Sequence, residues 1–131
     1  MIVSGARRAM MAFVLSFVLA AGLLATPTPA SAAASQCPAG YFCVWEHSPF
    51  TGHFAYFKTG SSDLRNAIGG FVFNNRITDV WNRAYPFCIY DGTSYRDPRK
   101  RINLGFQGYL GDWNDRISSL HFEDAGGGYP C

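Results

Sequence analysis

The chain has 131 residues, of which 48% are hydrophobic and 15% are charged, and its formal net charge is +2. Two of the eleven basic residues, Arg7 and Arg8, lie in an amino-terminal segment that we expect to be removed, which leaves nine basic and nine acidic residues. A neutral chain has no general reason to bind nucleic acid or an anionic membrane, so we expect neither as a partner.

Residues 1–32 are typical of a secretory signal peptide. Arg7 and Arg8 precede an apolar run over residues 9–24, and the small residues Ala30-Ser31-Ala32 follow it as a cleavage site. The run is short for a membrane span, so an uncleaved anchor is the weaker alternative. Cleavage after Ala32 would leave a single secreted domain, residues 33–131, without membrane attachment, and we expect it to be a monomer.

The mature part contains all four cysteines, Cys37, Cys43, Cys88 and Cys131. An even number of cysteines in an exported chain favours disulfides over metal thiolates or a catalytic thiol. Three pairings are possible. Turn-forming residues between Cys37 and Cys43 favour joining these two, which leaves Cys88 to pair with Cys131 and to fix the tail, residues 124–131. A zinc site is the weaker alternative, because neither pair has the Cys-x-x-Cys spacing.

Strand patterns occupy most of the mature chain. Aromatic and β-branched residues alternate or cluster in short runs, with turn formers such as Ser48-Pro49 between them. Residues 61–70 could form one helical turn, between serine or aspartate caps and Gly69-Gly70. We expect residues 84–86 to connect two halves. The strand-like runs include residues 41–45, 53–57, 71–73, 80–82 and 120–122.

The second half of the chain repeats the order of the first. Cys43-Val44-Trp45-Glu46 corresponds to Cys88-Ile89-Tyr90-Asp91, forty-five residues later. Asn74-Asn75-Arg76-Ile77-Thr78-Asp79 corresponds to Asn114-Asp115-Arg116-Ile117-Ser118-Ser119, forty residues later, and each precedes a strand-like run. Neither half is long enough to bury a good core alone, so we expect the two halves to pack together.

The two six-residue loops carry oxygen-bearing side chains, which are the ligands that Ca²⁺ prefers. Asn, Asp, Ser and Thr before a strand are also ordinary turn formers, and for one loop alone this explanation is equally good. The repetition favours at least one calcium site, above all with the second loop, which ends in two hydroxyls. Calcium takes six to eight oxygens, so a two-fold arrangement in which each loop serves both sites would supply enough of them.

These residues carry a family resemblance. The run Trp45-x-x-x-x-Phe50-x-Gly52 resembles the hairpin of βγ-crystallin Greek keys, and the two loops resemble the calcium-binding clamp of microbial members. Cys37-Pro38-Ala39-Gly40-Tyr41-Phe42-Cys43 resembles the amino terminus of the secreted metalloproteinase-inhibitor family of actinobacteria. The resemblance implies an all-β fold with two intercalated Greek keys, about residues 37–83 and 84–123, in a two-sheet sandwich. Asp97 stands where the second hairpin usually has glycine.

The resemblance also implies which residues bind calcium. Thr78 and Ser118 would supply hydroxyl oxygens, and Glu46 and Asp91 would contribute from the opposing hairpins. We expect one or two calcium ions, with a dissociation constant of about 10⁻⁵ to 10⁻³ M because few ligands are charged. The full predicted ligand set is Glu46, Asn74, Asn75, Thr78, Asp91, Asn114, Asp115 and Ser118.

Three functions agree with these features. The resemblance implies a calcium-binding peptidase inhibitor, with an extracellular peptidase as its partner. The same fold could instead be a calcium-stabilised structural or stress protein, or a toxin-like extracellular protein, without a peptidase target. We do not expect an enzyme, because the sequence has no G-x-S-x-G or H-E-x-x-H motif. The candidate inhibitory loop is Asp97-Pro98-Arg99-Lys100-Arg101, which has no neighbouring cysteine pair to stabilise it.

Overall fold

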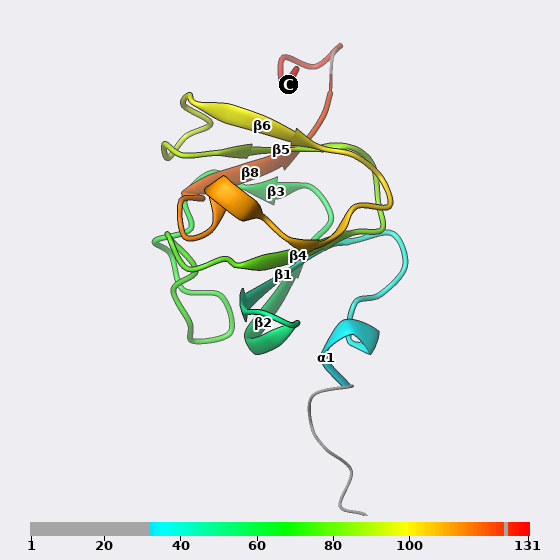
Figure 1. The fold of residues 1–131 in the computed structure, drawn as a ribbon. Helices are drawn as coiled ribbons and strands as arrows, with labels where there is room; N and C mark the ends of the chain where they lie inside the picture. Colours follow the sequence, from blue (N-terminus) through cyan, green and yellow to red (C-terminus); the bar gives the residue numbers. More distant parts are fainter. Residues whose placement is uncertain (1–31, 125) are drawn as a thin grey trace, which may run out of the picture.

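Two four-stranded antiparallel sheets make up most of the computed structural model, which describes residues 32–124 and 126–131 (Figure 1). Residues 1–31 of the predicted signal peptide lie outside the described residues. Within the described part, no helix is long and apolar enough to span a membrane. The elements are α1 (Ala32–Ser35), β1 (Phe42–His47), β2 (Thr51–Phe57), β3 (Gly60–Ser61), β4 (Asp79–Asn82), β5 (Phe87–Tyr90), β6 (Arg99–Ile102), β7 (Gln107–Tyr109), the 3₁₀ helix η2 (Gly111–Trp113) and β8 (Ser119–Phe122).

Each half of the chain contributes one strand to the sheet of the other half. The first sheet has the order β2-β1-β4-β7, and the second has the equivalent order β6-β5-β8-β3. In each half the first two strands form a hairpin, the third crosses to the opposite sheet, and the fourth returns to pair with the first. β7 thereby pairs with β4, and β3 pairs with β8. This topology confirms the predicted all-β sandwich of two intercalated Greek keys.

The core lies between the sheets and draws on both halves. Phe42 and Val44 on β1 and Phe87 and Ile89 on β5 are all fully buried in one apolar cluster. The rings of Phe42 and Phe87, which occupy equivalent positions, stack with their centroids 4.5 Å apart and their planes 15° apart. Burying a large apolar side chain contributes about 1.5–3 kcal/mol, so the packing across this contact supplies much of the attraction between the halves.

Alternate residues of the same strands point to the outer faces, where the disulfides lie. Cys43 and Trp45 on β1 form a second buried cluster with Cys37, separate from the main core. Cys37 is bonded to Cys43 and Cys88 to Cys131, with Cα–Cα distances of 5.8 and 5.5 Å. These are the pairs that the turn residues favour. Cys43 and Cys88 are equivalent residues, so each disulfide attaches one end of the described chain to a central strand.

The segment between β3 and β4 differs from the sequence-based expectation. The predicted helical turn in residues 61–70 is absent from the described structure, where β3 begins this segment and turns follow. Asp63 instead accepts a hydrogen bond at 3.0 Å from the backbone N–H of Arg65, which favours a tight turn over a helix. Residues 71–73 form no strand, because only a single bridge pairs Ile68 with Phe71.

The two disulfides are expected to stabilise the fold unequally. Cys37–Cys43 spans a sequence separation of 6 and Cys88–Cys131 one of 43, so the second restricts the unfolded chain much more. Replacing Cys88 and Cys131 with alanine should lower the free energy of unfolding by about 4 kcal/mol, against about 2 kcal/mol for Cys37 and Cys43. Urea unfolding followed by tryptophan fluorescence measures both, and equal losses would contradict the expectation.

Candidate metal centre

The two predicted ligand loops, residues 74–79 and 114–119, lie directly against each other. Their second residues, Asn75 and Asp115, adopt left-handed backbone conformations with φ of 54° and 57°, which Asn and Asp tolerate better than most residues. The N–H of Asn75 donates to the carbonyl of Ile117 at 3.0 Å, and the N–H of Asp115 donates to that of Ile77, also at 3.0 Å. Equivalent atoms therefore join the loops around an approximate two-fold axis.

The hydroxyl groups at the fifth position of each loop face other oxygens. The Thr78 hydroxyl donates to the backbone carbonyl of Glu46 at 2.7 Å. The Ser118 hydroxyl lies 3.3 Å from Oδ1 of Asn75, in the other loop. Two oxygens that each lie 2.3–2.6 Å from one calcium ion, at right angles, are about 3.5 Å apart. The loops thus bring oxygens from both halves together at a spacing that one cation can use.

The carboxylates of Glu46 and Asp91 have other partners. Oε2 of Glu46 lies 2.6 Å from Nδ1 of His53, and Oε1 lies 3.6 Å from Nε2 of His47. The hydrogen bond from His53 lowers the pKa of Glu46, because it stabilises the ionised carboxylate. Asp91 Oδ2 accepts a hydrogen bond at 2.8 Å from Arg116. Glu46 reaches the loop through its backbone carbonyl, while both carboxylates are held by neighbouring side chains.

Two amide oxygens at the first loop positions are left without partners. Oδ1 of Asn74 and Oδ1 of Asn114 are buried and accept no hydrogen bond within the described residues. An unsatisfied buried polar atom costs about 1–3 kcal/mol, so its repetition at equivalent positions calls for an external partner. Water or a cation can supply that partner at both positions.

The predicted ligands are oxygen groups of the kind that a hard cation accepts. Their oxygens come from amides, hydroxyls and the backbone, with the carboxylate of Asp115 in the second loop, and calcium accepts all of these. The described residues include no group of three or more His, Cys, Asp and Glu side chains placed to hold a metal ion. The guanidinium groups of Arg76 and Arg116, which lie over the rings of Phe71 and Trp113, add positive charge to the loops and would lower their affinity for a cation.

The sixth residue of each loop fixes the hairpin of its own half, a role that sequence reasoning missed. Oδ2 of Asp79 accepts a hydrogen bond at 2.9 Å from the N–H of Phe50, and Oγ of Ser119 accepts one at 3.0 Å from the N–H of Tyr95. Phe50 and Tyr95 both have positive φ, 52° and 58°, so each hairpin is held in a folded-over conformation. The sequence feature that could have revealed this role is the aromatic residue at the same place in both hairpins, Phe50 and Tyr95.

The second hairpin accommodates Asp97 at the position of Gly52 in the first hairpin. Gly52 has a φ of 79° in the first hairpin, whereas Asp97 keeps an ordinary negative φ. Ser94 and Tyr95 take up the left-handed turn instead, with φ of 56° and 58°. The left-handed residues are therefore 94 and 95 in the second hairpin, where the first hairpin has 50 and 52.

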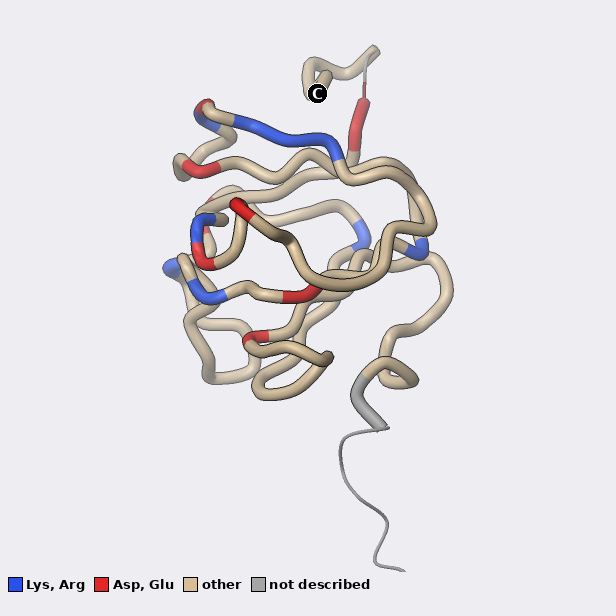
Figure 2. The backbone as a smooth tube through the Cα atoms, in the orientation of Figure 1, with Lys and Arg blue, Asp and Glu red and all other residues tan. Residues whose placement is uncertain are grey.

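The candidate inhibitory loop is a loop only at its start, and this corrects the expectation. Arg99, Lys100 and Arg101 belong to β6, at the edge of the second sheet, where they pair with Tyr90, Ile89 and Cys88 (Figure 2). The sequence did not predict this strand because its three basic residues are all exposed, so apolar and polar residues do not alternate along it.

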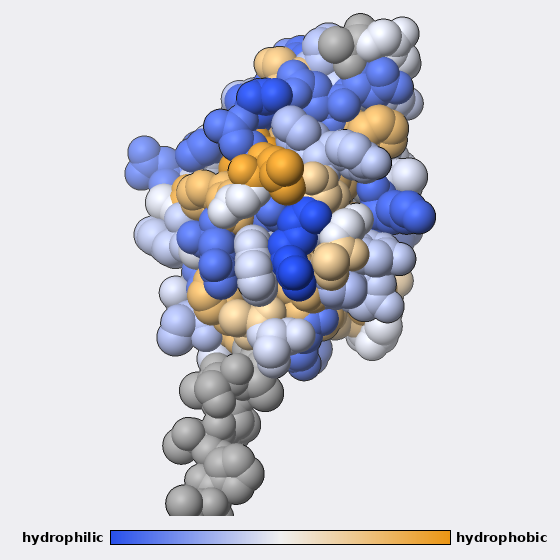
Figure 3. All heavy atoms as spheres, turned by 90° about the vertical axis from the view of Figure 1, so that its right-hand side faces the viewer, coloured by the Kyte–Doolittle hydropathy of each residue, from blue (hydrophilic) through white to orange (hydrophobic). Residues whose placement is uncertain are grey.

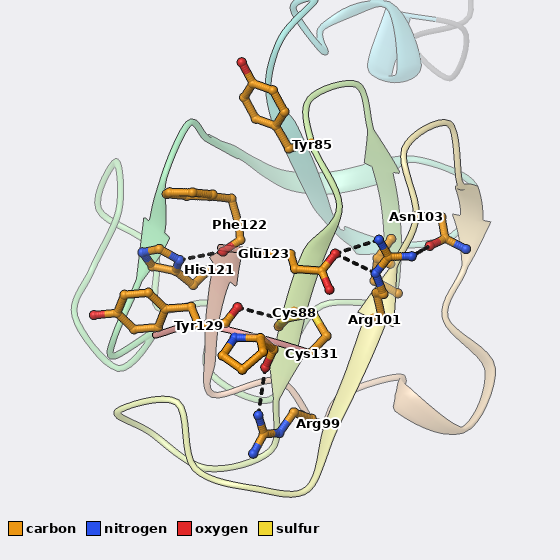
Figure 4. The surroundings of a disulfide bond; sticks show 12 residues. Tyr85, Cys88, Arg99, Arg101, Asn103, His121, Phe122, Glu123, Tyr129 and Cys131 are labelled. Carbon is orange, nitrogen blue, oxygen red and sulfur yellow. Dashed lines mark hydrogen bonds and ion pairs between the residues drawn. A yellow bond between two sulfur atoms is a disulfide. The ribbon is translucent and has the colours of Figure 1, made fainter. Parts of the chain in front are cut away.

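A disulfide lies next to this strand, although no cysteine is near it in sequence. Arg101 of β6 pairs with Cys88, which is bonded to Cys131 (Figure 4). Arg99 donates a hydrogen bond at 2.8 Å to the carbonyl of Pro130, and Arg101 forms an ion pair at 2.6 Å with Glu123. The tail and the edge strand therefore stabilise each other.

The fold defines the protein as a βγ-crystallin-like domain. Similar solved structures include a βγ-crystallin from Ciona intestinalis, at 22% identity and TM-score 0.56, covering 64% of this chain and 100% of that chain. An archaeal βγ-crystallin, at 17% identity and TM-score 0.55, covers 65% and 99%. The amino-terminal domain of Protein S, at 15% identity and TM-score 0.53, covers 63% and 93%. At these identities the similarity establishes the fold alone.

The sequence assigns the chain to a family within this fold. The sequence model of peptidase inhibitor family I36 matches residues 30–102, which is more than half of the chain. The chain therefore belongs to peptidase inhibitor family I36. A comparison with curated proteins found no match. Both the predicted family and the expectation of a non-enzyme are confirmed by this membership.

The hydrogen bonds of Ser119 should be essential for the second hairpin. Its hydroxyl donates to the carbonyl of Gly92 at 2.6 Å and accepts from the N–H of Tyr95. Replacing Ser119 with alanine leaves both partly buried backbone groups without this partner and should destabilise the fold by about 1–3 kcal/mol. Chemical unfolding measures the change. Ser62→Ala is the control, since the exposed Ser62 side chain makes no such bonds, and an equal loss in both variants would contradict the role of Ser119.

Proposed function

We propose that the protein is a secreted peptidase inhibitor whose paired loops bind calcium. The single observation that carries the inhibitor role is the match of residues 30–102 to peptidase inhibitor family I36. Secretion is supported by the signal-peptide pattern of residues 1–32 and by two disulfides, which persist in oxidising compartments. The partner is then an extracellular peptidase, and a metallopeptidase is the first class to test.

Calcium has a structural role in this proposal. At the second site, the Ser118 hydroxyl and the Asn75 amide oxygen would share one ion. At the first site, the Thr78 hydroxyl would take the equivalent role with the Glu46 carbonyl beside it, and Asp115 is the residue equivalent to Asn75. A bound ion would cross-link the two halves and supply the buried amide oxygens of Asn74 and Asn114 with a positive partner.

The inhibitor role is tested by titrating the purified mature protein, residues 33–131, against secreted metallopeptidases and serine peptidases. We expect at least one peptidase to lose its activity at a stoichiometric ratio, with the inhibitor intact by mass spectrometry. The reduced and alkylated protein is the control, because it keeps the composition but loses both disulfides. If no peptidase in a broad panel is inhibited, the inhibitor role fails, and the structural or toxin-like alternatives take its place.

The metal proposal is tested by the melting temperature in calcium and in chelator. Binding to the folded state at a hundredfold excess over Kd adds about 2.7 kcal/mol, which corresponds to a rise of about 10 °C or more for a domain of this size. Magnesium should have much less effect, because it demands a regular octahedral site.

Variants locate the ion. Ser118→Ala and Asp115→Ala should each reduce the calcium-induced rise, while circular dichroism in chelator stays unchanged. Asp112→Ala is the matched control, since it removes an exposed carboxylate just outside the loop. The same melting temperature in millimolar calcium and in chelator would leave both loops as turns without a metal.

A further inference from the structure

The loop between β6 and β7, residues 103–106, is held in one conformation by Asn82. This buried residue of β4 donates its N–H to the carbonyl of Phe106 at 2.9 Å and accepts from the N–H of Gly105 at 2.8 Å. Its side-chain Nδ2 donates to the carbonyl of Ile102 at 2.9 Å. Gly105 has a φ of 89°, which turns the chain back toward Asn82. One buried residue therefore fixes both ends of an exposed loop, the side chain at Ile102 and the backbone at Gly105 and Phe106.

Leu104 is exposed at the tip of this loop, and its backbone makes no hydrogen bond in the described part of the chain. Its side chain is 61% exposed, and that of Phe106 is 38% exposed. The N–H and C=O of Leu104 make no hydrogen bond in the described part of the chain, although the residues on both sides do. Figure 3 faces the side on which this loop lies and shows hydrophobic residues exposed among hydrophilic ones.

Single exposed apolar residues are common, so exposure alone says little about function. The combination found here is more specific. A pre-ordered loop loses little conformational freedom on binding, and a residue with a free N–H and C=O can pair with another main chain as an added strand. A protruding leucine also fits the apolar pockets that line small binding sites.

We propose that Leu104 is the primary contact with the inhibited peptidase. Its side chain enters an apolar specificity pocket, its N–H and C=O pair with the peptidase main chain, and Phe106 packs beside the pocket. This assignment rests on the proposed inhibitor function and adds a partner class: an endopeptidase that accepts a large aliphatic side chain. No covalent step is required.

The basic strand before the loop is the less suitable contact. Arg99 is paired with Asp97, and Arg101 with Glu123, so their charges are already satisfied within the chain. Lys100 is exposed and has no such partner in the described residues, and a trypsin-like pocket would have to use it. Because β6 leads directly into the loop, we expect residues 97–101 to lie at the edge of the contact.

The test measures inhibition constants of the mature protein against three purified endopeptidases. One is a zinc enzyme with an apolar specificity pocket, one is a serine enzyme with an apolar pocket, and one is trypsin-like. We expect inhibition of an apolar-pocket enzyme. Leu104→Ala and Leu104→Asp should weaken it by about 30-fold or more, as for a central contact residue. Leu104 is exposed, so both variants should keep the melting temperature of the wild type.

Two matched variants complete the design. Val72→Ala also truncates an exposed aliphatic residue, which is 40% exposed and lies in another loop, and should change the inhibition constant less than about threefold. Lys100→Ala should likewise have little effect. Unchanged inhibition by both Leu104 variants would overturn the assignment and leave the inhibitor function intact. The same conclusion would follow if the protein inhibits the trypsin-like enzyme and Lys100→Ala abolishes that inhibition. Failure of the wild type against every peptidase would instead refute the function itself.

Discussion

Strand exchange between the two halves of the chain holds the two sheets together. β3 completes the sheet of the second half and β7 completes that of the first, so neither half can form its own layer alone. The same exchange places Phe42 against Phe87 and buries one apolar cluster between the layers. Because the core belongs to both halves, opening either one exposes it, and this couples the halves into one cooperative unit.

The exchange also creates the candidate metal centre. Each six-residue loop precedes a returning strand, so the approximate two-fold axis that relates the strands brings the loops together. Within each loop, the residues have separate tasks. The fifth position presents a hydroxyl to oxygens of another segment, and the sixth holds the hairpin of its own half through Phe50 or Tyr95. The first loop has Asp79 where the second has Ser119. Asp79 still accepts the hydrogen bond from the hairpin through Oδ2, but its Oδ1 is buried without a partner in the described structure.

The outer faces of the two halves are covered by the two ends of the described chain. Near the amino terminus, Cys37 is bonded to Cys43, and its carbonyl accepts a hydrogen bond at 2.6 Å from Arg83. At the other end, Tyr129 stacks on His121 with ring centroids 4.0 Å apart, beside the Cys88–Cys131 disulfide. The loop at residues 103–106 is covered by neither end, and the buried Asn82 fixes it from within. This loop is therefore held in place by hydrogen bonds to Asn82 while its outer side chains are exposed.

The sequence by itself determined the class of fold and the position of the candidate site. Strand alternation, turn chemistry and cysteine count are local properties, and the internal repeat made the two halves and their oxygen-bearing loops visible in advance. Tertiary structure decided which atoms face each other. It directed the backbone of Glu46, and not its carboxylate, toward Thr78, and it paired Asp91 with Arg116. It also made Arg99–Ile102 an edge strand and left Leu104 exposed with a free backbone. These outcomes depend on hydrogen bonds and packing between residues that lie on different elements and are nine or more positions apart, which no local pattern encodes.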